Sequence, residues 1–239
     1  MINEPLSDLN FIEGEVLLFD KPYRWTSFDL VRKVRSVIRK HLGKQKIKVG
    51  HAGTLDPLAT GLMIICTGRM TKQIEKFQAS EKEYIAELFL GATTPSFDLE
   101  TSVDNHFETG HIDKGLIIKV LEGFLGQQEQ IPPSYSAKWV DGQRAYKKAH
   151  KGIEVEMKPA LVTVHEIEFL TYNNPILTIR VNCSKGTYIR SLARDIGLAL
   201  NSGAYLANLR RTRTGDFLVG KAMKIEDFIL KENLAQIAS

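Results

Sequence analysis

Apolar and polar positions along the chain follow two different periods, which predict helices and strands in turn. Helices are predicted where apolar residues recur every three or four positions, at residues 27–38, 114–125, 187–200, 205–210 and 225–230. The first of these follows Thr26 and Ser27, whose hydroxyl groups can cap a helix. Strands are predicted at short apolar runs bounded by turn residues, at residues 16–19, 84–90, 161–170, 176–183 and 217–219.

The order of these elements indicates the fold class. Helices and strands mix without the regular strand–helix–strand alternation of a parallel sheet, which favours an α+β fold with a mixed sheet over a Rossmann or TIM arrangement. The chain has 239 residues, enough for a self-sufficient core. It carries no internal repeat and no obvious linker.

Positive charge is concentrated although the net charge is only +4. Between residues 32 and 48 lie eight Lys or Arg residues and no acidic residue, and a second group gathers at Arg210, Arg211 and Arg213. Local basic patches on a nearly neutral chain fit a polyanion such as RNA. The other interpretation is a solvated basic helix face.

The cysteines and the apolar runs limit the setting of the protein. Cys66 and Cys183 lie far apart in apolar stretches and are predicted to be buried free thiols, which suits a reducing cytosol. Residues 1–13 carry Glu4, Asp8 and Glu13 and lack the apolar segment of a signal peptide. The apolar runs fall short of the about 20 residues that a membrane helix needs.

The most informative segment is VGHAGTLDPLATGLMIICTG, residues 49–68. Asp56 precedes Pro57, and proline is favoured at the first helical position, so Asp56 is predicted to be the N-cap of a helix running from Pro57 towards Cys66. The N-terminus of such a helix would favour an ionised carboxylate. The alternative is a catalytic carboxylate, because Asp56 stands on a glycine-rich loop beside His51 and just after the basic helix. Neither a Walker phosphate loop nor a dinucleotide-binding glycine motif is present.

A second cluster, SKGTYIRSLARDIG at residues 184–197, places Tyr188 and Arg190 in the first turn of a predicted helix. A packing aromatic residue and a surface arginine are the simplest interpretation of this pair. Arg210 and Arg211 equally fit a solvated helix end.

Together these segments resemble the TruB family of tRNA pseudouridine synthases, from about residue 14 to about residue 230. The matching motifs, in chain order, are LLFDKPYRWTS (17–27), GHAGTLDPLATG (50–61), KEYIAELFLG (82–91), IPPSYSA (131–137), KGTYIRSLARDIG (185–197) and NLRRTRTGDF (208–217). The second is similar to the family's signature around its catalytic aspartate, the third to its active-site tyrosine segment and the fourth to the start of an RNA-gripping insertion.

The resemblance implies a fold and a reaction. It implies a pseudouridine synthase catalytic domain at 14–230, with a mixed, mostly antiparallel sheet flanked by helices and an RNA-binding insertion at about 127–158. An extension at 1–13 and a tail at 231–239 complete the chain, without a C-terminal PUA domain. The implied reaction converts uridine 55 in the TΨC loop of elongator tRNA to pseudouridine: the N1–C1′ bond is cleaved and the turned base rejoins through C5. No metal or organic cofactor, membrane or obligate protein partner is expected, and the implied protein is a cytoplasmic monomer.

The resemblance also assigns roles to individual residues. It makes Asp56 the catalytic carboxylate, Tyr84 the tyrosine that stacks on the target base and can take a ribose proton, and Arg190 the arginine that pairs with Asp56. The implied substrate-binding residues are His51 near the flipped nucleotide, Lys72 as a phosphate contact, and Tyr188 and Leu209 lining the uracil pocket. They also include Asp98, the acidic residue kept in the loop at 93–100, and Lys21 in the first motif.

Two stretches depart from the family pattern, and several alternatives stay open. Lys138 and Trp139 replace an aliphatic residue and a lysine in the insertion, and Phe97 lies in the changed loop TTPSFDLE. A carboxylate at position 56 can attack C1′, attack the uracil ring, or act after an elimination. A non-catalytic RNA-folding module and an RNA-guided synthase are the other functions considered. Intact candidate catalytic residues favour an active enzyme, and the absence of a PUA domain argues against the guided type.

Overall fold

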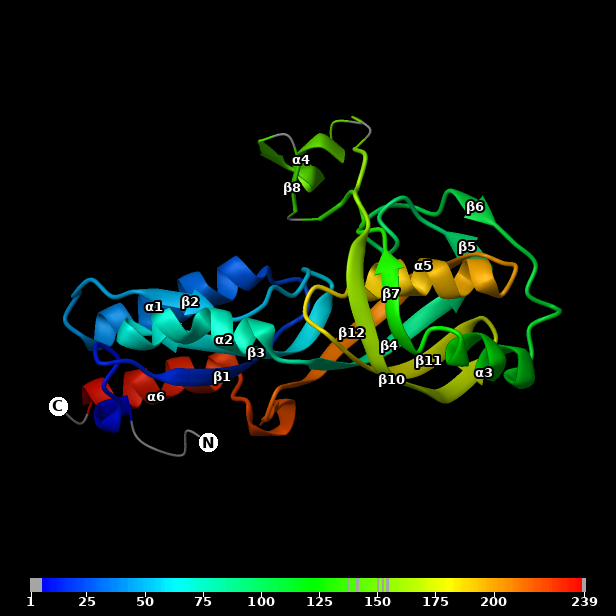
Figure 1. Cartoon of the computed structure of the whole chain (residues 1–239). Coiled ribbons are helices and arrows are strands. Elements are labelled where there is room, and N and C mark those ends of the chain that lie inside the picture. The colour runs from blue at the N-terminus through cyan, green and yellow to red at the C-terminus, as the bar shows by residue number, and fades with distance from the viewer. Residues whose placement is uncertain are drawn as a thin grey trace. The chain divides into compact units, whose positions relative to one another are not determined.

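The computed structural model describes residues 6–237 except 137, 141, 150, 152 and 154 (Figure 1). The chain forms two compact units, residues 1–84 with 210–239 and residues 85–209. Each unit mixes helices with strands, and the strands pair mostly antiparallel, with two isolated parallel bridges. This confirms the predicted α+β class. Over the described part of the chain, every helix is too short or too polar to cross a bilayer.

The elements of the first unit surround the strand β3. They are η1 (Leu6–Asp8), β1 (Val16–Lys21), α1 (Ser27–His41), β2 (Val49–His51), β3 (Ala59–Thr67), η2 (Gly68–Gln73), α2 (Ile74–Ala79), β13 (Phe217–Leu218), η3 (Val219–Lys221) and α6 (Ile225–Ile237). β1 pairs with β3 from Val16↔Cys66 to Lys21↔Gly61. β2 pairs with the other end of β3, from Val49↔Thr67 to His51↔Ile65.

Different helices cover the two faces of this sheet, because successive side chains of a strand point to opposite faces. The side chains of Leu18 and Ile64 belong to a cluster on one face that also includes residues of η2, α2 and β13, namely Met70, Ile74, Phe77 and Phe217. On the other face the ring of Phe19 meets Phe228 of α6 edge-on, with centroids 5.3 Å apart. The ends of β1 and β3 are therefore held in a packed core.

The basic helix is confirmed as α1. Thr26 is its N-cap: the Thr26 hydroxyl accepts a hydrogen bond from the Asp29 amide (3.0 Å), and the Asp29 carboxylate accepts one from the Thr26 amide (3.1 Å). This reciprocal capping box satisfies two amides that a helix start leaves unpaired. The apolar stripe is buried, at Leu30, Val31, Val34, Val37 and Ile38. The opposite side of α1 carries the arginine and lysine side chains.

The helix predicted from Pro57 towards Cys66 is wrong. Pro57 and Leu58 form a turn, and the residues after them form β3. Eight of the nine residues of β3 are buried, so the strand shows no alternation of apolar and polar residues. A short run buried on both faces cannot be told from a buried helix by periodicity. The argument that a helix N-terminus favours an ionised Asp56 therefore falls away.

The short helix predicted at residues 205–210 is also wrong, because this segment lies in the long strand β12 (Ala204–Thr214). Leu206 and Leu209 stand three residues apart and imitate a helical stripe. In the structure Tyr205 stacks on Phe89 of β4 (Lys82–Leu90), with centroids 5.1 Å apart and planes 9° apart. Cross-strand aromatic contacts of this kind stabilise a sheet.

The second unit contains the predicted hairpin and the second predicted helix. β10 (Ala160–Asn173) pairs with β11 (Ile176–Cys183) and, at its other edge, with β7 (Gly126–Gln130). β7 is polar in sequence and was not predicted; the helix before it, α3 (Lys114–Glu122), ends earlier than expected. The smaller elements are β5 (Ala92–Thr93), β6 (Asn105–His106), β8 (Trp139–Val140), β9 (Gln143–Arg144) and α4 (Ala145–Ala149).

The helix α5 (Ile189–Ala199) packs close to β12 within this unit. A Cβ on Gly197 would lie 2.4 Å from the Ala204 amide nitrogen, so only glycine fits there. Both cysteines are buried and free, as predicted. The predicted extension, insertion and tail each include residues outside the described part of the chain, among them Ala137 at the end of the IPPSYSA motif.

Candidate functional site

Asp56 lies on a bend between β2 and β3, in the first unit, and its side chain is half-buried. Hydrogen bonds to the backbone of the residues on each side of Asp56 hold the bend. The Ser27 hydroxyl bridges to Leu55, donating to its carbonyl and accepting from its amide, both at 2.8 Å. The Arg24 amide donates to the Pro57 carbonyl at 2.8 Å. The carboxylate is thus fixed on a loop that the start of α1 anchors.

Lys21, predicted as a substrate-binding residue, is fully buried under this bend. Its ammonium group donates to three backbone carbonyls, those of Pro22 (2.9 Å), Trp25 (2.6 Å) and Pro57 (3.3 Å). Burial lowers the pKa of Lys21 from 10.5 to about 8; the charge of Asp56 acts against this shift and that of Arg211 adds to it. Lys21 therefore ties together the two loops beside Asp56 and places a cation near its carboxylate.

Arg211 supplies a second buried cation. It is 1% exposed and lies in β12, so the prediction of a solvated helix end is wrong for this residue. Its Nε donates to the Leu62 carbonyl (2.7 Å) and its Nη2 to the Gly53 carbonyl (3.2 Å). A Cβ on Gly61 would lie 2.3 Å from the Arg211 carbonyl oxygen, which explains the glycine at that point of the signature. A nearby positive charge favours the ionised form of a carboxylate.

The other predicted residues of this unit differ in exposure. His51 ends β2 and is half-buried; burial lowers the pKa of its imidazole, and Arg211 lowers it further, while a backbone hydrogen bond at Gly53 opposes both. The ring is therefore neutral at pH 7. Tyr84 lies on the buried face of β4 and is 8% exposed. Lys72 is exposed at the end of η2, where it can meet a phosphate.

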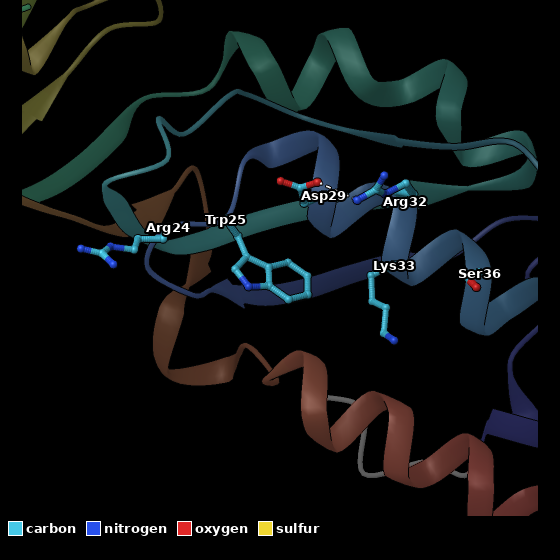
Figure 2. Close-up of a pocket in the computed structure, with 6 residues that line it drawn as sticks. All are labelled: Arg24, Trp25, Asp29, Arg32, Lys33 and Ser36. Carbon is cyan, nitrogen blue, oxygen red and sulfur yellow. Dashed lines mark hydrogen bonds and ion pairs between the residues drawn. The ribbon is translucent and has the colours of Figure 1, made fainter. Parts of the chain in front are cut away.

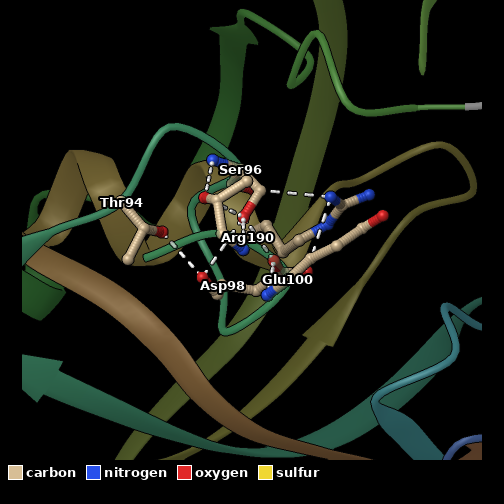
Figure 3. A network of polar contacts seen from close by, with 6 residues as sticks. Thr94, Ser96, Asp98, Glu100 and Arg190 are labelled. Carbon is tan, nitrogen blue, oxygen red and sulfur yellow. Dashed lines mark hydrogen bonds and ion pairs between the residues drawn. The ribbon is translucent and has the colours of Figure 1, made fainter. Parts of the chain in front are cut away.

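A second set of predicted residues forms a buried polar network in the other unit (Figure 3). Asp98 is 4% exposed, and its Oδ1 accepts hydrogen bonds from the Ser96 hydroxyl (2.6 Å) and the Glu100 amide (2.9 Å). Its Oδ2 lies 3.5 Å from Nη1 of Arg190, which also donates to the Ser96 carbonyl at 3.4 Å. Arg190 is 3% exposed, so the surface-arginine interpretation is wrong.

The loop that carries Asp98 holds Phe97 in an unusual backbone conformation. Phe97 has a φ of 62°, a left-handed conformation that is strained for an aromatic residue. The guanidinium of Arg194 from α5 lies over the Phe97 ring, 4.7 Å from its centroid. The Thr94 hydroxyl donates to the Asp98 carbonyl at 2.7 Å. These contacts fix the loop around Phe97, where the sequence departs from the family pattern.

Gln130 fixes the start of α5, a contact that the sequence did not reveal. Its side-chain oxygen accepts from the Tyr188 amide (2.8 Å) and its side-chain nitrogen donates to the Tyr188 carbonyl (3.1 Å). Tyr188 is the N-cap residue of α5 and is half-buried. Leu209, predicted beside it in a uracil pocket, is 7% exposed in β12. Asp56 belongs to one unit and Arg190 to the other, so their pairing stays a prediction.

The described residues group no three His, Cys, Asp or Glu side chains in a way that could hold a metal ion. Comparison with known proteins decides the family. A family model described as the TruB family pseudouridylate synthase N-terminal domain matches residues 39–189, well over half of the chain. The chain belongs to the TruB family of pseudouridylate synthases. A second model, the tRNA pseudouridylate synthase B C-terminal domain, matches residues 190–236.

Relatives of this TruB-family chain match it over nearly their whole length. The tRNA pseudouridine synthase B of Phocaeicola vulgatus is 60% identical over 220 residues, which cover 92% of this chain and 94% of that protein. The protein of the same name from Parabacteroides distasonis is 55% identical over 232 residues, covering 96% and 98%. The family is one of isomerases, and the chain is a member of it throughout its two units.

Solved structures agree with this fold. A chain from the crystal structure of a Cbf5–Nop10–Gar1 complex superposes with a TM-score of 0.69 at 29% identity, covering 94% of this chain and 57% of that one. A chain from an archaeal box H/ACA Nop10–Cbf5 complex gives a TM-score of 0.67 at 26% identity, covering 98% and 58%. The TruB-family chain therefore spans little more than half of the length of these structural neighbours.

Proposed function

We propose that this chain converts uridine 55 in the TΨC loop of tRNA to pseudouridine, with Asp56 as the catalytic carboxylate. The relatives named tRNA pseudouridine synthase B support the substrate. The observation that carries the assignment of Asp56 is its place on an anchored bend beside two buried cations, Lys21 and Arg211. A positive charge beside a half-buried carboxylate favours its ionised form, the form that can act as a nucleophile or stabilise a charged intermediate.

The other residues take the roles that the family pattern implies. The target base must leave its stack before a carboxylate can reach it, which costs a few kcal/mol. Stacking on Tyr84 returns about 1–3 kcal/mol, and a neutral His51 can hold the flipped nucleotide. Tyr188 and Leu209 line the uracil, Lys72 contacts a phosphate, and Lys21 supports the Asp56 bend. Arg190, which pairs with Asp98, is the proposed partner of Asp56.

The reaction needs no oxidant, reductant or second substrate. The N1–C1′ bond breaks, the base turns, and a C5–C1′ bond forms; the hydrogen on C5 is lost as a proton and N1 gains one. Asp56 supplies a negatively charged carboxylate that can attack or stabilise the electron-poor C1′ or the uracil ring. A cytoplasmic monomer that acts on free tRNA is the setting that we propose for this reaction.

The test is the Asp56→Asn variant, assayed for pseudouridine at position 55 of an unmodified tRNA transcript. We expect no product under single-turnover conditions and tRNA affinity close to that of the wild type. Asn is nearly isosteric, and Asp56 caps no helix, so the melting temperature should change little. Product formed by this variant at a rate near the wild type would refute the role of Asp56.

The same experiment separates catalysis from a tRNA-folding activity, the alternative function considered from the sequence. Folding of tRNA needs binding and release but no carboxylate at position 56. We expect the Asp56→Asn variant to keep any ability to refold a misfolded tRNA transcript, measured by its aminoacylation, while making no pseudouridine. Loss of both activities together would show that the folding activity depends on turnover.

A further inference from the structure

The face of α1 that points away from the core is a cationic groove. Two adjoining hollows follow the helix, one lined by Arg24, Trp25, Asp29, Arg32, Lys33 and Ser36, the other by Arg32, Arg35, Ser36, Arg39, Lys40, Gly43 and Lys44. They share Arg32 and Ser36, so they form one continuous groove from Trp25 to Lys44. Figure 2 shows the first half, with Arg32 turned towards Asp29 and Lys33 extending away from it.

Three cations of this groove have unpaired side chains. Lys33, Arg39 and Lys44 are exposed, and their side chains make no hydrogen bond or ion pair with any residue that the structure describes. By contrast, Arg32 pairs with Asp29 at 3.0 Å, Arg35 donates to the Val49 carbonyl at 2.9 Å, and Lys40 donates to the Asn233 side chain at 3.2 Å.

Helix stability alone does not account for this arrangement. A cation in the last turn of a helix interacts well with the helix dipole, which explains Arg39 and Lys40. Lys33 lies in the second turn and Lys44 beyond the helix end, where the dipole gives them nothing. Arg35 and Arg39 form a like-charge pair at i,i+4 spacing, which destabilises a helix slightly. An external polyanion would remove this repulsion.

The groove also has a defined direction relative to Asp56. Arg24, at the start of the groove, donates to the Pro57 carbonyl beside Asp56, and the buried Ser27 at the start of α1 contacts Leu55. From there α1 rises about 1.5 Å per residue, so Arg39 lies roughly 18 Å further along the helix than Ser27. That distance corresponds to several nucleotides of a nucleic-acid strand, at about 3.4 Å each.

We propose that the α1 groove binds the sugar–phosphate backbone of the substrate RNA several nucleotides away from the uridine on which Asp56 acts. This inference rests on the proposed RNA-modifying function and extends it. Phosphates are the anions that a row of arginine and lysine side chains recognises without reading sequence. Ser36, a small residue at the point where the two hollows meet, leaves space for a backbone to lie against the helix.

The first test neutralises the three unpaired cations. The triple variant Lys33→Gln, Arg39→Gln, Lys44→Gln keeps helix propensity, because Gln is as good a helix former as Lys or Arg. Each phosphate contact contributes about one unit to the slope of log affinity against log salt, so we expect the slope for tRNA to fall by about three and the affinity to fall roughly tenfold or more. Saturating single-turnover rates should stay at the wild-type value.

The matched control is Lys119→Gln, Lys221→Gln, Lys224→Gln, which removes the same charge from exposed positions outside the groove. We expect it to change the salt slope little. A groove variant that binds tRNA no more weakly than this control would overturn the proposal. Failure of the wild-type protein to make pseudouridine would instead count against the proposed function, because the binding comparison stands without turnover.

A second test locates the RNA directly. Both native cysteines are buried, so Ser36→Cys offers a single exposed thiol for a tethered iron chelate that cleaves nearby RNA backbone by hydroxyl radicals. We expect cleavage at a cluster of nucleotides separated in sequence from the target uridine. Cleavage confined to the target loop, or none above that of an unmodified control, would overturn the proposed position of the RNA.

Discussion

Replacement of Lys21 by Met tests the buried cation beneath Asp56. Met fills a similar volume but leaves three carbonyl groups, those of Pro22, Trp25 and Pro57, without their donor. Each buried acceptor that loses its partner costs about 1–3 kcal/mol, and removal of a desolvated charge offsets part of the sum. We expect the free energy of unfolding at pH 7 to fall by about 2–4 kcal/mol.

The pH dependence of this difference identifies its cause. The pKa of Lys21 is about 8 in the folded protein because burial disfavours the ammonium, against 10.5 for an ordinary lysine. Between these two values the unfolded chain holds a proton that the folded protein has released, so the contribution of Lys21 to stability rises with pH. At about 1.4 kcal/mol per pH unit, the gain reaches about 3 kcal/mol across the window.

Urea unfolding of the wild type and the Lys21→Met variant, at intervals from pH 7 to pH 10, measures this gain. The variant is needed as the reference because Cys66 titrates in the opposite sense: burial raises the pKa of its thiol from 9.0 to about 11, so its contribution is lost as pH rises through that range. Both proteins contain Cys66, and its effect cancels. Parallel pH profiles for the two proteins would refute the view that burial lowers the pKa of Lys21.

Three further substitutions test other parts of the two units. For Tyr84→Phe we expect a loss of pseudouridine formation of at least tenfold with little change in tRNA affinity; a normal rate with a lower melting temperature would show a purely structural tyrosine. For Arg190→Ala we expect a similar loss of rate and, because Asp98 loses a buried cation 3.5 Å away, a drop in stability of about 1–3 kcal/mol in urea titration. For Gly61→Ala we expect the free energy of unfolding to fall by about 3 kcal/mol, the upper part of the range for overpacked cores. The new methyl group would clash with the Arg211 carbonyl, and the residue has a φ of 105°. An unchanged melting temperature would contradict this.

Elements with a clear local signal were predictable. α1 has a capping pair, an apolar stripe and a polar face, and β10 and β11 are apolar runs around a turn, so sequence patterns found each of them. β3 and β12 lacked such a signal. β3 is buried along almost its whole length, and β12 places Leu206 and Leu209 at a spacing that suits a helix as well as a strand. Only tertiary pairing decides between these possibilities.

The candidate site shows the same division. The positions of Asp56, Tyr84 and Arg190 came from recognisable motifs, whereas the groups that hold them came from far along the chain. Gln130 contacts Tyr188 across 58 positions, and Arg211 reaches the Gly53 carbonyl across 158. Side chains brought together by folding leave no local pattern, and a buried Arg211 looks in sequence like any other basic residue beside Arg210.

The two buried cations replace the expected helix dipole as the source of positive charge near the Asp56 loop. A helix dipole would have served the carboxylate through backbone amides, but no helix begins at Pro57. Lys21 and Arg211 instead donate their hydrogen bonds to backbone carbonyls, of Pro57 and Gly53 among others, so the dipoles of the Asp56 loop point their negative ends at the cations. The same contacts that bury the cations therefore fix the loop, and Lys21 places a positive charge near the Asp56 carboxylate. Loop position and the positive charge near Asp56 are thus coupled in the first unit, so substitutions at Lys21 or Arg211 should lower stability and catalytic rate together.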